Sequence, residues 1–126
     1  MRVVFLCEEN ACRSQLAEAL AKRMFTDVGT EFASAGTHPA PEVDHRVLKV
    51  LQEEGINWQG RPQSLDQIGK PDIVVTMGCD VVCPYISGLK TIEWDLPNPR
   101  GKPIEKYRQL KRIIKDRLLE LREFNF

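Results

Sequence analysis

The four cysteines are the residues of this 126-residue chain with the most evident chemistry, and they form two close pairs. Cys7 and Cys12 lie near the N-terminus, whereas Cys79 and Cys83 lie far along the chain. Close thiol pairs are typical of catalytic, redox-active or metal-binding sites, whereas structural disulfides are typical of small secreted domains. A zinc or iron–sulfur site is disfavoured because the spacings lack the usual C-x2-C knuckle and neither histidine is suitably placed. We therefore expect thiol chemistry with no metal and no cofactor.

The segment from Cys7 to Ser14 reads CEENACRS and follows a short apolar run. A loop of this length between a strand and a helix can turn its backbone N–H groups inward and hold an anion at the helix N-terminus. Arg13 would bind two oxygens of a tetrahedral oxyanion, and Asn10 tolerates the left-handed turn that such a loop needs. The same positive potential favours a nucleophilic thiolate at Cys7, to which Ser14 would donate a hydrogen bond. The alternative is a buried thiol beside a surface arginine.

The elements that would position this loop alternate between strand and helix. Apolar β-branched runs predict strands at 2–7, 31–35, 72–77 and 90–94. Amphipathic spacing predicts helices at 14–28, 43–54 and 104–121, with a short helical piece at 64–68. This alternation predicts an α/β fold, a four-stranded parallel sheet with helices on both faces, in one domain covering residues 1–126. Ligands of such sheets bind beyond the carboxyl ends of the strands, which here lead into 7–14, 77–85 and 94–101.

Composition excludes several classes of function. The 18 Lys and Arg residues balance the 18 Asp and Glu residues, and acidic residues interrupt the basic ones on the last predicted helix, so we expect no nucleic-acid partner. The longest plain apolar run, Val3 to Cys7, is far shorter than the roughly 20 residues of a membrane span. The same run stops at Glu8, which disfavours a secretory signal. We expect a cytoplasmic monomer that contacts no membrane.

Three motifs of the chain resemble the low-molecular-weight protein tyrosine phosphatase fold family: CEENACRSQLAEA from Cys7, SAGT from Ser34 and VVTMGC from Val74. Within that family the chain is most similar to the arsenate reductases that couple to thioredoxin, and the resemblance covers nearly its whole length. It implies the phosphatase-like sheet, Cys7 as the nucleophile and arsenate or another tetrahedral oxyanion as the substrate. The substrate-binding residues that it implies are Glu8, Glu9, Asn10, Ala11, Cys12, Arg13 and Ser14.

The second cysteine pair distinguishes reduction from phosphoester hydrolysis, because only a reductase has to move two electrons. The resemblance implies that Cys7 attacks arsenate, that Cys79 attacks the adduct and releases arsenite, and that Cys83 resolves the disulfide. Thioredoxin would then reduce the Cys79–Cys83 disulfide, with glutaredoxin or a low-molecular-weight thiol as alternative reductants. On a helix, residues four apart have Cα atoms about 6 Å apart, which suits a disulfide. The alternative is a pair of buried structural thiols.

The Pro-rich segment WDLPNP, residues 94–99, resembles the acid loop of the family but has Asn98 where an aspartate is expected. Asparagine cannot donate a proton to a poor leaving group, which weighs against a phosphatase more than against a reductase. Asp95 is the other candidate for handling protons. The predicted function is arsenate reduction. The alternatives are hydrolysis of phosphotyrosine or a small phosphoester, and a non-catalytic oxyanion-binding or redox-sensing module.

Some reductases of this group also hold a structural potassium ion. Asn10, Glu18 and Ser34 match part of that pattern, whereas the stretch from Pro62 to Ser64 does not clearly supply the rest. We therefore expect no obligatory metal in this chain.

Overall fold

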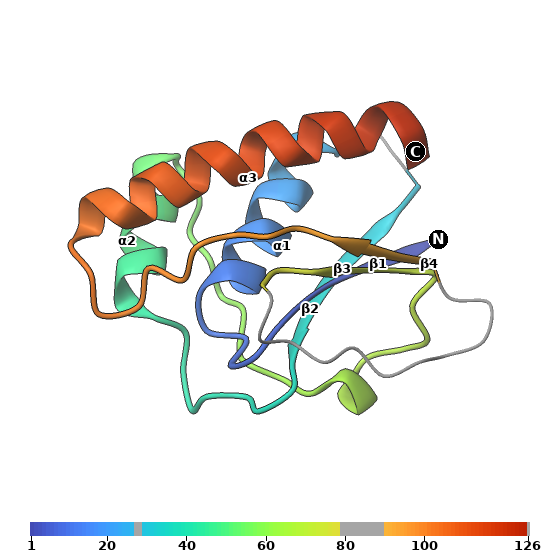
Figure 1. Ribbon diagram of the computed structural model, residues 1–126, viewed down its shortest axis with the longest axis horizontal. Coiled ribbons are helices and arrows are strands. Elements are labelled where there is room, and N and C mark those ends of the chain that lie inside the picture. The colour runs from blue at the N-terminus through green and yellow to red at the C-terminus, as the bar shows by residue number, and fades with distance from the viewer. Residues whose placement is uncertain (27–28, 79–89, 126) are drawn as a thin grey trace.

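Strand β1 (Arg2–Cys7) lies between β2 (Glu31–Gly36) and β3 (Ile73–Thr76), which explains why its sequence RVVFLC is almost wholly apolar. Strand β4 (Lys90–Glu93) completes the order β2-β1-β3-β4, and every neighbouring pair is parallel. The computed structural model describes residues 1–26, 29–78 and 90–125, with side chains as far as Arg122. The predicted four-stranded parallel sheet is confirmed (Figure 1).

The three α-helices lie together on one face of the sheet (Figure 1). They are α1 (Arg13–Met24), α2 (His45–Glu53) and α3 (Ile104–Asn125). The described part of the opposite face is covered by the 3-10 helix η1 (Leu65–Gln67) and its neighbours, which pack against a small cluster around Val4 and Leu6. Helical segments therefore flank both faces, but the larger layer and the main core lie on the side of the α-helices.

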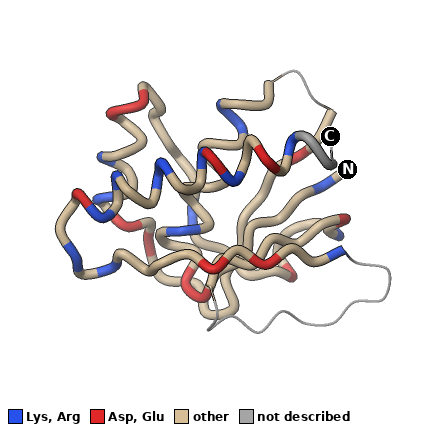
Figure 2. Tube along the Cα trace, turned by 45° about the horizontal axis from the view of Figure 1, so that its top comes forward, with Lys and Arg blue, Asp and Glu red and all other residues tan. Residues whose placement is uncertain are grey.

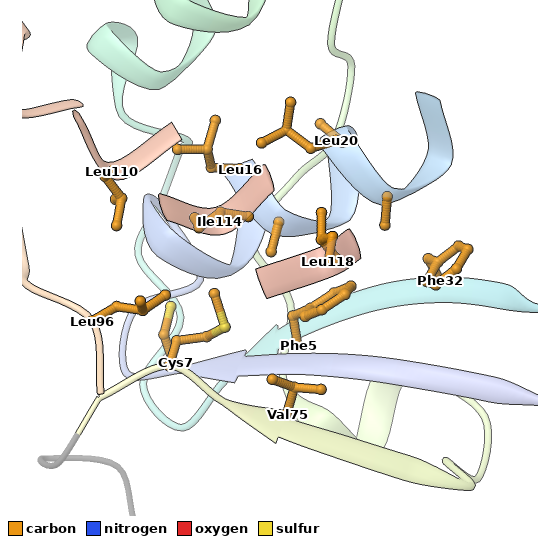
Figure 3. Packing of buried hydrophobic residues seen from close by; sticks show 14 of the residues in the cluster. Phe5, Cys7, Leu16, Leu20, Phe32, Val75, Leu96, Leu110, Ile114 and Leu118 are labelled. Atoms are coloured by element: carbon orange, nitrogen blue, oxygen red, sulfur yellow. The ribbon is translucent and has the colours of Figure 1, made fainter. Parts of the chain in front are cut away.

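The main core fills the space between the sheet and this helical layer. Helix α3 contributes a stripe of buried side chains at spacings of three and four: Tyr107, Leu110, Ile114, Leu118 and Leu121. Figure 3 shows the side chain of Cys7 at the end of β1, on the same side of the sheet as Phe5 and beside Leu96. Full burial of one such Leu or Ile contributes about 1.5–3 kcal/mol, so this core holds the strand that ends at Cys7 in place.

Acidic and basic residues alternate along α3 (Figure 2), and several of its basic side chains form ion pairs with carboxylates: Arg108, Lys111, Arg112, Lys115 and Arg117. Arg108 Nη2 lies 2.8 Å from Glu53 Oε2, and Lys115 Nζ lies 2.9 Å from Glu54 Oε1. The hydrogen bond from Arg108 lowers the pKa of Glu53, and the hydrogen bond from Lys115 lowers that of Glu54. These pairs connect α3 to the end of α2, which favours a solvated, charge-balanced surface over a nucleic-acid site. No helix in the described residues is long and apolar enough to cross a membrane.

Candidate active site

The loop between β1 and α1 turns its carbonyl groups away from the space that it encloses. Five of these carbonyls accept backbone hydrogen bonds of 2.7–3.2 Å. The acceptors are Cys7, Glu8, Glu9, Ala11 and Cys12, and the donors, in the same order, are Thr37, His38, Ala40, Asp44 and Leu16. Because a carbonyl and the next N–H point in opposite directions across a planar peptide, the following N–H groups point into the enclosed space. Asn10 has a φ of 51°, the left-handed conformation expected for it.

Helix α1 begins without a side-chain cap. Its N-cap residue, Cys12, makes no side-chain hydrogen bond to the first turn, and that turn contains no acidic residue. The first amides of a helix usually bond to a Ser, Thr, Asp or Asn side chain. Here they point towards the loop, so an anion held by the loop would take the place of the cap and meet the positive end of the helix dipole.

The Cys7 sulfur lies in a buried polar contact with the helix. Its Sγ is 2.8 Å from Ser14 Oγ, and Asn10 Nδ2 donates to the same hydroxyl oxygen at 2.7 Å. Because the oxygen accepts from Asn10, the hydroxyl proton is available for the sulfur, an arrangement that stabilises a thiolate more than a thiol. The contact predicted between Ser14 and Cys7 is therefore present.

Arg13 connects the ends of three strands. Its Nη1 donates to the carbonyl of Met77 at 3.0 Å and to that of Leu96 at 3.3 Å, and the residue is almost fully buried. Met77 follows β3 and Leu96 follows β4, so the predicted convergence of the strand ends is confirmed for the residues that the structure describes. Cys79 and Cys83 lie outside the described residues.

A cavity of about 170 Å³ opens above Cys7. Its lining consists of Cys7, Glu8, Glu9, Ala11, Cys12, Arg13, Asn98 and Arg100. This volume is below the roughly 300–1,000 Å³ of pockets for drug-sized ligands and suits a small inorganic anion. The structure brings Asn98 to the cavity, whereas Asp95 is exposed and absent from its lining. The predicted loop residues Asn10 and Ser14 lie behind the lining and support it, since both are fully buried.

A larger cavity of about 620 Å³ lies beside η1, and its lining is mostly apolar. Leu6, Leu65 and Ile68 contribute to that lining, and no cysteine or arginine does. The smaller cavity is the candidate active site, because the Cys7 thiol, the Arg13 guanidinium and the inward-facing amides converge there.

The family model described as low molecular weight phosphotyrosine protein phosphatase matches residues 2–124. This chain belongs to that family. Arsenate reductases are among the proteins that are similar to this chain. An arsenate reductase from Staphylococcus aureus is 31% identical over 120 residues, which cover 90% of this chain and 89% of that protein.

Two solved structures extend the comparison. A thioredoxin-dependent arsenate reductase from Corynebacterium glutamicum is 37% identical with a TM-score of 0.80, covering 97% of this chain and 60% of that one. An arsenate reductase from Archaeoglobus fulgidus is 30% identical with a TM-score of 0.84, covering 94% of this chain and 97% of that one. The structural similarity therefore covers nearly the whole chain.

Two residues beside the loop between β1 and α1, Arg100 and Asp44, were not predicted from the sequence. Arg100 lines the cavity, with its Nη1 3.4 Å from Glu9 Oε2 and its Nε 3.8 Å from Asp44 Oδ2. Asp44 also caps α2 through the amide of Arg46 and accepts a 2.6 Å hydrogen bond from the Tyr107 hydroxyl. Burial and this carboxylate raise the pKa of Tyr107 to about 12, so the phenol remains a donor. Asp44 thus connects the loop to both α2 and α3.

Cys12 lines the cavity but is unsuited to act as a nucleophile. Burial, and then the negative charge of Asp44, raise the pKa of the Cys12 thiol far above its usual range. A protonated thiol is a poor nucleophile, so Cys7 is the better candidate within this loop.

The described residues do not fit a potassium site at Glu18. Its Oε1 accepts a 2.6 Å hydrogen bond from Ser34 Oγ, and its Oε2 lies 2.7 Å from the ammonium of Lys22. Asn10 Oδ1 accepts from Gln15 Nε2 at 3.1 Å and from the Gln63 amide at 2.9 Å. The oxygens that would face a cation therefore already bind protein donors, one of them positively charged.

Gly36, at the end of β2, allows the loop to pack against the sheet. A Cβ at this position would lie 2.7 Å from the Glu8 carbonyl oxygen and 2.8 Å from the Asn10 amide nitrogen. Both are backbone atoms of the loop, so Gly36→Ala must displace it. We expect Gly36→Ala to lower the free energy of unfolding by about 1–3 kcal/mol and to reduce kcat/KM by about tenfold or more.

Urea unfolding and steady-state kinetics measure both effects, and Gly29→Ala is the matched control. A Cβ at Gly29 meets no atom within 4 Å, so that variant should keep the wild-type values. Equal behaviour of the two alanine variants would contradict the role given to Gly36.

Proposed function

We propose that this protein reduces arsenate to arsenite by a relay of three cysteines, regenerated by thioredoxin. The arsenate reductases from Staphylococcus aureus and Archaeoglobus fulgidus support the reaction. The thioredoxin-dependent enzyme from Corynebacterium glutamicum supports the choice of reductant. The cavity of the candidate active site also supports the proposal, because its size suits an oxyanion and its lining includes the Cys7 thiol and Arg13.

The first step is binding of arsenate in the 170 Å³ cavity. The inward-facing amides and the N-terminus of α1 bind its oxygens, and the guanidinium of Arg13 compensates the remaining negative charge. Arg13 is held in position by the carbonyls of Met77 and Leu96, so little conformational entropy is lost when the anion arrives.

The chemistry then proceeds by displacement and thiol exchange. The Cys7 thiolate attacks arsenic, and an arsenate oxygen leaves as water after protonation, giving a Cys7–S–As(V) adduct. The Cys79 thiolate attacks the Cys7 sulfur, the S–As bond breaks, and its electron pair reduces As(V) to As(III), which leaves as arsenite. Cys83 attacks Cys79, restores the Cys7 thiolate and forms the Cys79–Cys83 disulfide. Reduced thioredoxin, a dithiol, reduces that disulfide and is itself oxidised.

Asn98 is the observation that favours reduction over phosphoester hydrolysis. It lines the same cavity as Cys7, and its Oδ1 accepts a 3.2 Å hydrogen bond from the Arg100 amide. An amide in this place cannot protonate the alkoxide or phenoxide leaving group of a phosphoester. Arsenate loses water and carries exchangeable protons of its own, so it depends less on an acid at this position.

Phosphoester hydrolysis is the second candidate, because the cavity, Cys7 and Arg13 are also what a Cys–phosphate intermediate requires. Without an acid at position 98 it should be slow with phenolic esters of high leaving-group pKa and faster with activated esters.

The test is a coupled assay that follows NADPH oxidation with arsenate, thioredoxin and thioredoxin reductase. We expect oxidation that depends on arsenate and on thioredoxin, with one arsenite formed for each NADPH consumed. Omitting thioredoxin is the control. Absence of arsenate-dependent turnover from a protein whose thiols are shown to be reduced would reject the proposal in favour of a phosphatase.

A further inference from the structure

A continuous chain of hydrogen bonds runs from Cys7 through the buried interior to the indole of Trp58. Trp58 Nε1 donates to Gln15 Oε1 at 2.8 Å, and Gln15 Nε2 donates to Asn10 Oδ1 at 3.1 Å. Asn10 Nδ2 then reaches Ser14 Oγ at 2.7 Å, and Ser14 Oγ reaches Cys7 Sγ at 2.8 Å. The three residues between Trp58 and Cys7 in this series, Gln15, Asn10 and Ser14, are fully buried.

Trp58, at the outer end of this series of hydrogen bonds, determines the direction of every bond in it. An indole N–H can only donate, so the oxygen of the Gln15 amide must face Trp58 and its NH₂ must face Asn10. The Asn10 oxygen then accepts, its NH₂ donates to Ser14, and the hydroxyl proton of Ser14 is left for the Cys7 sulfur. A reversed Gln15 amide would place its NH₂ against the indole N–H, two donors, and its oxygen against Asn10 Oδ1, two acceptors.

Two further contacts support the same polarity. The backbone amide of Gln63 donates to Asn10 Oδ1 at 2.9 Å, so the orientation of Asn10 is fixed from two sides. The ammonium of Lys22 lies 5.4 Å from the centroid of the Trp58 ring, a cation–π contact that holds the indole and favours donation by its N–H. Linked hydrogen bonds that run in one direction strengthen one another, so the outer bonds affect the one at Cys7.

We infer that Gln15 and Trp58 are positioning residues that hold Asn10 and Ser14 in the polarity that stabilises the Cys7 thiolate. The inference rests on the proposed role of Cys7 as the nucleophile. It extends the active site by two residues that do not line the cavity.

The test follows alkylation of Cys7 by iodoacetamide against pH, with the modified site identified by peptide mass spectrometry. Gln15→Met removes the amide with little change in size, and Trp58→Phe removes the indole N–H while keeping an aromatic ring. We expect Gln15→Met to slow alkylation about threefold below the midpoint of the profile and to raise that midpoint by about half a pH unit. Trp58→Phe should act in the same direction by about twofold.

Gln63→Met is the matched control, because its side chain bonds to the Ser34 carbonyl and only its backbone contacts Asn10. This variant should keep the wild-type midpoint. The double variant of Gln15 and Trp58 should raise the midpoint no further than Gln15→Met does, since both residues act through the same series of hydrogen bonds.

Two outcomes would overturn the inference. One is an unchanged midpoint in both Gln15→Met and Trp58→Phe, and the other is an equal shift in Gln63→Met. Should Gln15→Met fail to fold, Trp58→Phe alone decides, since its side chain is only partly buried. Alkylation requires neither arsenate nor thioredoxin, so its result is independent of whether the coupled assay succeeds.

Discussion

Serine in place of Cys7 is expected to abolish both arsenate reduction and phosphoester hydrolysis, whereas serine in place of Cys79 is expected to abolish reduction alone. Cys7 ends β1 and lines the cavity, and in the proposed mechanism both reactions begin with its sulfur as the nucleophile. A hydroxyl is a far weaker nucleophile near neutral pH, so losses of about a thousandfold or more are expected. Cys79 acts only in the step that transfers two electrons from the thiols to arsenic. Phosphoester hydrolysis has no such step.

The coupled arsenate assay and hydrolysis of p-nitrophenyl phosphate, run on the same preparations, measure the two activities. Binding of inorganic phosphate by both variants, followed by calorimetry, checks that the cavity is intact. Arsenate turnover in Cys79→Ser above the background without enzyme would contradict the three-thiol relay. Loss of p-nitrophenyl phosphate hydrolysis in Cys79→Ser would show that this residue supports the fold rather than the electron transfer.

Lysine in place of Arg13 is expected to lower kcat/KM for arsenate by about a hundredfold or more. A lysine ammonium keeps the charge but loses the planar fork that binds two oxygens at once. Its three N–H donors are also too few to bond the carbonyls of Met77 and Leu96 and two oxygens of the anion together, whereas arginine has five. The change therefore weakens both substrate binding and the connection between the loops that follow β1, β3 and β4.

Arg100→Lys is the matched control for this variant, because Arg100 lines the same cavity but is more than one-third exposed. Its contacts to Glu9 and Asp44 are longer and solvated, so a loss within about fivefold is expected. Steady-state kinetics with arsenate measure both variants. Similar losses at the two positions would show that net charge, rather than the geometry of Arg13, governs substrate capture.

Local sequence patterns predicted most of the elements, because the signals that form them are local. The apolar run of β1 and the spacing of buried residues in α3 are visible in the sequence, as is Gly55, whose φ of 78° ends the turn after α2. The nucleophilic loop was predictable for the same reason, since Cys7, Asn10 and Ser14 lie within eight consecutive residues. The last helix extends to Asn125, beyond the predicted end at residue 121, because no glycine or proline stops it.

The supporting contacts were not predictable, because they join residues that are far apart in the sequence. Gln15 and Trp58 are separated by 43 positions, and Asp44 and Tyr107 by 63. Nothing in the type or spacing of these residues indicates that they meet. Arg100 is different, since it lies two positions after Asn98 on the same loop and could have been proposed as a rim residue.

The missing side-chain cap of α1 has a consequence for turnover. A bound oxyanion would complete this helix, so any dianion of suitable shape would raise the thermal stability of the protein with the logarithm of its concentration once that exceeds its Kd. Arsenate is such an anion near neutral pH, whereas arsenous acid is uncharged and gains little from the helix end. Reduction therefore removes the charge by which the ligand is held, and product release is driven by the same chemistry that forms the product.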